Sequence, residues 1–281
     1  MGTSSRSTTA SALLAALAAA LVAAFVLVPG PLAANLSGGG FGDQHHLIDR
    51  LSESFVGYWN SGGRDFTPDL GRVVGYWRHF HEVKAVAAAL LLAVLIALGV
   101  RLWQAFLRAG QTLGAGRRAA LASAGVVVLA LALVSLAAVM ANVQGAIAPF
   151  SSLLSMLPMH TSHGALADTL DQVRQRLADY PHAGGRAPGA VEVMVGDFGR
   201  YHAVIAVAAP LVAVALAGWS ALSWRRFART EVSDRRARRL FRSFGLLAAL
   251  LALGAVVVAV ANIGTTADPA PALLAFFQGG W

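Results

Sequence analysis

The chain contains no cysteine among its 281 residues. Disulfide bridges, thiolate metal ligands and thiol catalysis are therefore excluded, whereas the redox compartment stays undecided. Charge is also scarce, because only 13% of the residues are Asp, Glu, Lys or Arg, against about a quarter in a soluble domain. The missing charge leaves long apolar runs, which are typical of an integral membrane protein.

Lysine is nearly absent as well, since Lys84 is the only one and arginine supplies almost all of the positive charge. The net charge is +8, but the arginines cluster in short segments beside the apolar runs, as topology determinants do. This distribution argues against binding of nucleic acid. The partners that we expect are the lipid bilayer and a membrane or envelope protein, or further copies of the chain in a homo-oligomer.

Five apolar runs each approach the length of about 20 residues that crosses a bilayer as a helix. They cover residues 12–28, 85–106, 119–143, 203–223 and 244–261. We therefore expect an all-α fold with about five transmembrane helices. We interpret residues 1–30 as an uncleaved N-terminal anchor, and a cleaved signal peptide is the alternative.

The short segments between spans are basic and the long segments are not. Residues 101–118 hold four arginines and residues 224–243 hold eight, against only Glu231 and Asp234 as acids. Short basic loops stay in the cytoplasm, so we expect a cytoplasmic N-terminus and an extracytoplasmic C-terminus in a bacterial plasma membrane. Residues 29–84 and 143–202 would then form a small helical extracytoplasmic cap.

The second and third spans resemble the fourth and fifth. The signature is Asn142, Pro149 and Leu153-Leu154 in the first copy and Asn262, Pro269 and Leu273-Leu274 in the second, with identical spacing. We expect a parallel internal duplication, with residues 31–158 as the first repeat and residues 159–281 as the second. Each repeat holds two spans, so both have one orientation, unlike the inverted repeats of many transporters.

Each repeat opens with an amphipathic helical pattern outside the spans. The apolar stripes consist of Leu47, Leu51, Phe55 and Trp59 in the first repeat and of Leu166, Leu170, Val173 and Leu177 in the second. Such stripes must be buried against one another, against lipid headgroups or against a partner. We expect an exposed apolar patch of the kind that marks interaction sites near Phe55, Trp59 and Trp77.

Every histidine lies on the expected outer side. These residues are His45, His46, His79, His81, His160, His163, His182 and His202. His160 and His163 have helical i,i+3 spacing and are weak candidates for a shared metal, as are His79 and His81, although no spacing matches a known metal motif. No pair of acids indicates acid–base catalysis. We therefore assign no catalytic residue and no cofactor.

The segments Phe80-His81-Glu82-Val83-Lys84-Ala85-Val86 and Pro271-Ala272-Leu273-Leu274-Ala275-Phe276-Phe277, together with the Asn-to-Pro-to-Leu-Leu spacing, resemble uncharacterised multi-pass membrane proteins of actinobacteria. The resemblance covers most of the chain and implies a membrane location, but no activity, cofactor or catalytic residue.

The leading hypothesis for function is a non-enzymatic scaffold or accessory subunit that acts through its extracytoplasmic cap. One alternative is a facilitator or channel for an uncharged or lipid-like solute. An ion-coupled carrier is disfavoured, because no Asp, Glu or Lys lies mid-span. A second alternative is a metal or haem redox protein that uses the outer histidines.

Overall fold

The computed structural model describes residues 2–108, 114–180 and 189–280, and within these ranges every regular element is an α-helix. The helices are α1 (Gly2–Leu27), α2 (Pro29–Leu36), α3 (Gln44–Ser61), α4 (Pro68–Arg108), α5 (Ala115–Ile147), α6 (Pro149–Leu154), α7 (Ala165–Asp179), α8 (Gly189–Arg229), α9 (Arg235–Ala267) and α10 (Pro269–Phe277). They form two compact units, residues 1–40 with 79–146 and residues 41–78 with 147–281.

Five helices in the described part of the chain, α1, α4, α5, α8 and α9, are long and apolar enough to cross a membrane. Large apolar side chains lie exposed along them, such as Val214 at 72% and Leu250 at 68% of their surface. Water would disfavour such a surface, whereas hydrocarbon solvates it. The predicted all-α fold with five helices able to span a membrane is confirmed.

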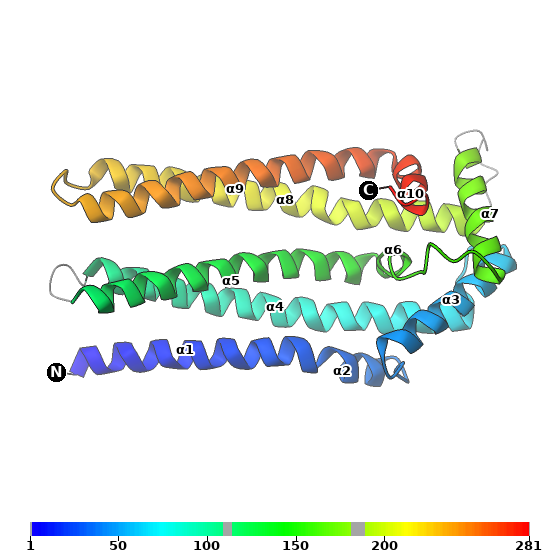
Figure 1. Ribbon diagram of the computed structural model, residues 1–281, viewed down its shortest axis with the longest axis horizontal. Helices are drawn as coiled ribbons and strands as arrows, with labels where there is room; N and C mark the ends of the chain where they lie inside the picture. The colour runs from blue at the N-terminus through cyan, green and yellow to red at the C-terminus, as the bar shows by residue number, and fades with distance from the viewer. Residues whose placement is uncertain (1, 109–113, 181–188, 281) are drawn as a thin grey trace. The chain divides into compact units, whose positions relative to one another are not determined.

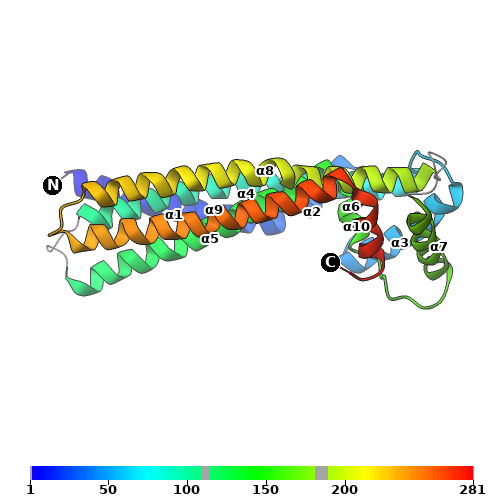
Figure 2. The ribbon, with the colours of Figure 1, turned by 90° about the horizontal axis from the view of Figure 1, so that it is seen from above.

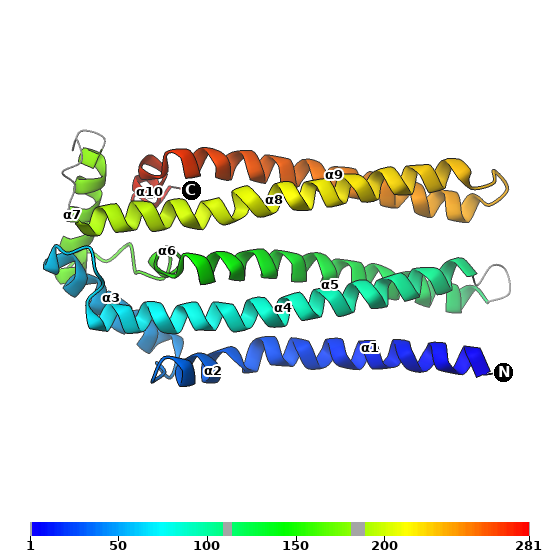
Figure 3. The same cartoon turned by 180° about the vertical axis from the view of Figure 1, so that it is seen from behind.

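In the first unit, α1 packs along the antiparallel pair α4–α5, as Figure 3 shows. Ala18 of α1 is buried together with Leu95 and Leu98 of α4 and Val128 of α5. A polar contact adds to this packing, because the Arg101 Nε atom donates a hydrogen bond of 3.4 Å to the Ser11 hydroxyl. The helix α1 is therefore packed against other helices of this unit.

In the second unit, α8 and α9 run side by side and antiparallel, joined by a short turn (Figure 1). Asp234 caps the first turn of α9, where its carboxylate accepts a hydrogen bond of 3.0 Å from the Ala237 amide. This bond satisfies one of the amides that a helix start leaves free. The cap sets where the chain turns back and α9 begins.

At the end of the second unit where α8 begins and α9 ends, the short helices α3, α6, α7 and α10 gather (Figure 2). They bury one apolar cluster with the first turns of α4 and α8, which we call the large core. Its fully buried members include Leu51, Phe55, Tyr58, Leu70, Phe150, Leu153, Leu154, Leu170, Val173, Leu177, Val191, Met194, Leu273 and Phe277. The two amphipathic stripes predicted from the sequence both face this core.

Proline begins the short helices α6 and α10, at Pro149 and Pro269, which follow the long helices α5 and α9. Proline suits a first helical position because its missing N–H would have no partner there. Each proline therefore ends the preceding long helix and starts a short one. The short helices turn Phe150 and Leu273 into the large core.

Candidate functional site

Two long helices in each hairpin are joined by a histidine–asparagine pair. In the hairpin α4–α5, the His81 Nδ1 atom lies 2.9 Å from the Asn142 side-chain oxygen. The Asn142 amide nitrogen donates its own bond of 2.7 Å to the Ala138 carbonyl. The oxygen of Asn142 therefore faces the ring and must accept, so His81 carries a proton on Nδ1 in this network.

The hairpin α8–α9 contains the same arrangement. The His202 Nδ1 atom lies 2.8 Å from the Asn262 side-chain oxygen, and the Asn262 amide nitrogen donates a bond of 2.8 Å to the Val258 carbonyl. The paired residues are separated by 61 positions in the first hairpin and by 60 in the second. The spacing is visible in the sequence, but His81 was predicted there only as a candidate metal ligand and His202 was given no role.

The space around the two histidines differs. A Cβ atom added to Gly145 would come within 2.5 Å of the His81 ring, so glycine leaves the room that this ring occupies. At the corresponding position of the second hairpin stands Thr265, whose hydroxyl donates to the Ala261 carbonyl. The His202 ring instead has Phe198 beside it, with ring centres 4.6 Å apart.

A tryptophan–glycine contact joins the two helices at the end of each hairpin that lies away from the histidine–asparagine pair. The Trp103 ring lies where a Cβ atom on Gly125 would be 2.8 Å away, and the Trp224 ring lies 2.9 Å from the same point on Gly245. Trp103 also meets Phe106 edge to face, with ring centres 5.6 Å apart. Trp224 and Phe227 share that distance. Both hairpins are therefore fixed at each end by the same residue types.

Polar contacts join the segments that enclose the large core. Arg64 forms an ion pair with Glu192 at the start of α8, and the Asp197 carboxylate accepts a bond of 2.8 Å from the Ser151 amide at the start of α6. Asp197 is buried at 6% exposure, and the side chain of Arg200 lies 3.8 Å away. A carboxylate at a helix start is stabilised by the free amides and the helix dipole.

Arg174 of α7 performs a similar joining role. Its Nε atom donates a bond of 2.8 Å to the Phe277 carbonyl at the end of α10, and its Nη2 atom donates one of 3.1 Å to the Met159 carbonyl. Tyr58 of α3 is fully buried and donates its hydroxyl to the Arg64 carbonyl at 3.1 Å. Burial raises the pKa of Tyr58 to about 12, so the phenol stays protonated and keeps this bond.

The predicted interaction residues lie in the second unit, but one of them is not at the surface. Phe55 has no exposed side-chain area and packs in the large core beside Phe150, so its assignment to an exposed patch was wrong. The stripe that carries Phe55 is buried by other helices of the same chain. Trp59 is half-buried and donates a 2.9 Å bond to Gln172 of α7, and Trp77 donates a 3.0 Å bond to Ser152.

The metal candidates are not brought together. His160 and His163 lie exposed in the irregular segment between α6 and α7, so the helical spacing assumed for them does not exist. Pro158 and the positive φ of 91° at Gly164 account for this break. His79 instead contacts Glu82 of its own helix at 2.9 Å. His182 lies outside the described residues. In the described part of the chain, no three His, Asp or Glu side chains converge as metal ligands would.

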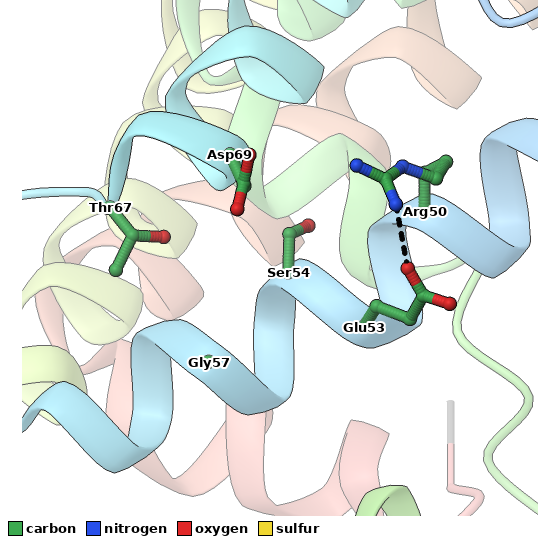
Figure 4. Close-up of a pocket in the computed structure, with 6 residues that line it drawn as sticks. All are labelled: Arg50, Glu53, Ser54, Gly57, Thr67 and Asp69. Atoms are coloured by element: carbon green, nitrogen blue, oxygen red, sulfur yellow. Dashed lines mark hydrogen bonds and ion pairs between the residues drawn. The ribbon is translucent and has the colours of Figure 1, made fainter.

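A shallow polar pocket of about 150 Å³ lies between α3 and the start of α4 (Figure 4). Its lining residues are Arg50, Glu53, Ser54, Gly57, Thr67 and Asp69. Arg50 and Glu53 form an ion pair of 2.9 Å across its rim, and Asp69 pairs with Arg72. Because these charged groups are paired and largely exposed to solvent, their interactions with one another are weak.

Comparisons with protein-family models, with curated proteins and with solved structures find no match to this chain.

Proposed function

We propose that this chain is a plasma-membrane scaffold or accessory subunit that acts through the folded end built around the large core. We further propose that this end is extracytoplasmic and that α4–α6 and α8–α10 are parallel copies of one unit. The observation that carries the proposal is that the folded part outside the spans and the basic charge lie in different segments of the chain. The helices outside the spans bury a closed aromatic and aliphatic core, whereas the segments of sequence that join the two spans of each pair are short and basic.

The duplication is supported by matching lengths and matching contacts. The helices α4 and α8 each contain 41 residues, and α5 and α9 each contain 33. The histidine–asparagine pair and the tryptophan–glycine contact occur once in each hairpin. Contacts of this kind depend on residues far apart in sequence, so they support the duplication separately from the likeness between the apolar runs.

The orientation is supported by the arginines. Eight of them flank the turn between α8 and α9, and short basic segments are retained in the cytoplasm. The large core then lies outside, where its polar outer faces meet the envelope. Within residues 41–85 and 148–180, no large apolar side chain of the described residues is exposed. A partner would therefore contact polar groups and the half-buried Trp59, a residue type enriched at interaction hot spots.

Site-directed crosslinking tests this function in cells. Because the chain has no cysteine, a single Gln175→Cys change on the exposed face of α7 gives one defined attachment point for a thiol-linked photocrosslinker. The matched control is Val232→Cys, which is 80% exposed in the turn between α8 and α9. The proposal predicts one adduct of discrete mass from position 175 and none of the same mass from position 232.

Other outcomes favour the alternatives. Protein-dependent passage of an uncharged solute into proteoliposomes, together with no adduct at position 175, would favour a facilitator. A stoichiometric metal or a visible absorption band that is lost in a His160→Ala, His163→Ala double variant would favour a redox protein. Either result would overturn the scaffold proposal.

A further inference from the structure

The turn between α8 and α9 gathers the strongest charge in the molecule. Between residues 224 and 243 there are eight arginines and two acids, which leaves a net charge of +6. The arginines are Arg225, Arg226, Arg229, Arg235, Arg236, Arg238, Arg239 and Arg242, and we call them the arginine cluster. They flank a turn of only five residues, from Thr230 to Asp234. Their mutual repulsion is therefore concentrated in one place.

The two acids offset only two of the eight positive charges. Asp234 accepts from the Ala237 amide and so is used to cap α9, while Glu231 accepts a 3.1 Å bond from the Ser233 hydroxyl. Most of the arginines are exposed, including Arg229, Arg235 and Arg239. A group of exposed guanidinium ions with so few nearby carboxylates favours an anionic ligand.

Aromatic rings hold part of the cluster in place across the hairpin. The Arg238 guanidinium of α9 lies 4.3 Å from the centre of the Phe227 ring of α8, and the Arg226 guanidinium of α8 lies 6.0 Å from the Phe241 ring of α9. Arg238 also donates a 3.0 Å bond to the Thr230 carbonyl. These reciprocal contacts order the side chains before any ligand arrives, which reduces the entropy cost of binding.

The position of the cluster identifies the ligand class. The helices α8 and α9 are both able to span a membrane, and the cluster lies at the end of one and the start of the other. Whichever way the hairpin crosses the bilayer, these side chains lie at the depth of the lipid headgroups. We propose that the arginine cluster is a binding site for the phosphates of anionic phospholipids.

The test is lipid binding to the full chain in mild detergent, measured by native mass spectrometry with added phosphatidylglycerol and, in parallel, phosphatidylcholine. A variant carrying Arg229→Gln, Arg235→Gln and Arg239→Gln removes three exposed charges without touching the Arg226 and Arg238 contacts. We expect it to weaken phosphatidylglycerol binding roughly 100-fold, from about fivefold for each charge. The matched triple variant Arg108→Gln, Arg117→Gln and Arg118→Gln, at the other turn, should weaken it less than about threefold.

A second variant keeps the test valid even where the triple variant does not fold. Glu231→Gln deletes an acid from the turn and should tighten phosphatidylglycerol binding about fivefold. An unchanged or weaker affinity would overturn the proposal, as would equal losses in the two triple variants or equal binding of phosphatidylcholine. Displacement of the lipid by millimolar inorganic phosphate would indicate a soluble anion as the ligand. Tighter binding of an acidic peptide would indicate a protein partner, and both results also count against the lipid site.

Discussion

The hairpins α4–α5 and α8–α9 share the contacts that hold two helices together and differ in what surrounds them. Both contain a histidine–asparagine pair at one end and a tryptophan–glycine contact at the other. The first hairpin has α1 packed against it, and the second has eight arginines at its turn. The shared contacts join the two helices of each hairpin, whereas the residues around these contacts differ.

The single lysine of the chain illustrates this difference. Lys84 of α4 lies 4.5 Å from the ring of Phe25 in α1 and 5.1 Å from the ring of Phe80. With the offset of 121 residues that relates His81 to His202, the corresponding position in α8 is Ile205, which is buried. The lysine therefore occurs where a helix is held against the hairpin.

The largest expected effect comes from exchanging the residues beside the two histidines. Gly145→Thr introduces a Cβ atom where the His81 ring stands, and we expect it to lower the free energy of unfolding by about 3 kcal/mol. The reverse change, Thr265→Gly, removes atoms without a clash and should cost about 1 kcal/mol through helix propensity. Denaturant titration in mild detergent measures both. Equal losses would show that the two sites are not built differently.

Removal of either histidine should lower the free energy of unfolding by a smaller amount, and by the same amount in both hairpins. His81→Leu and His202→Leu each leave an asparagine oxygen without its donor, at a cost of about 2 kcal/mol. The corresponding asparagine variants, Asn142→Leu and Asn262→Leu, serve in double-mutant cycles. A coupling energy present in one hairpin and absent in the other would show that the two histidine–asparagine pairs do not stabilise their hairpins alike.

The lysine contact should stabilise the packing of α1 against the first hairpin and have no counterpart in the second. Lys84→Met keeps an apolar stem but removes the cation above the Phe25 ring, so we expect a loss of about 1 kcal/mol and earlier protease cleavage after Arg6 or within α1. Ile205→Met is the matched control and should leave the accessibility of α1 unchanged. Identical cleavage patterns in both variants would refute a role for Lys84 in holding α1.

The smallest effect concerns the surface of the large core. Trp59→Phe removes the bond to Gln172 but keeps the aromatic ring, and the expected loss of stability is about 0.5 kcal/mol. If Trp59 contacts the partner, the yield of crosslinked adduct from position 175 should nevertheless fall in this variant. An unchanged adduct yield in this variant would show that α3 is not part of the contact surface.

The features that the sequence predicted are those that depend on neighbouring residues. Hydropathy identified the five long apolar helices, and the spacing of Leu166, Leu170, Val173 and Leu177 identified the buried face of α7. Both signals are local periodicities of a single helix.

Most of what the sequence did not predict depends on residues that are distant in sequence. The stripe with Phe55 indicated burial but not which surface covers it, and the cover proved to be Phe150 and other residues of the same chain. The pairing of His81 with Asn142 required knowing which helix faces which. Local breaks were also missed, since Pro158 and Gly164 place His160 and His163 outside any helix.

The central proposal, that the chain turns on the cytoplasmic side between α4 and α5 and between α8 and α9 and has its folded end outside, is tested most directly by cysteine labelling in intact cells. Single cysteines at Gly114 and Val232 probe the two turns, and cysteines at Ser61 and Gln278 probe the folded end. With an impermeant thiol reagent, the account predicts labelling at positions 61 and 278 and protection at positions 114 and 232 until the membrane is permeabilised. Labelling of one turn but not the other would contradict the parallel arrangement, and labelling of both turns with protection of the folded end would reverse the proposed orientation.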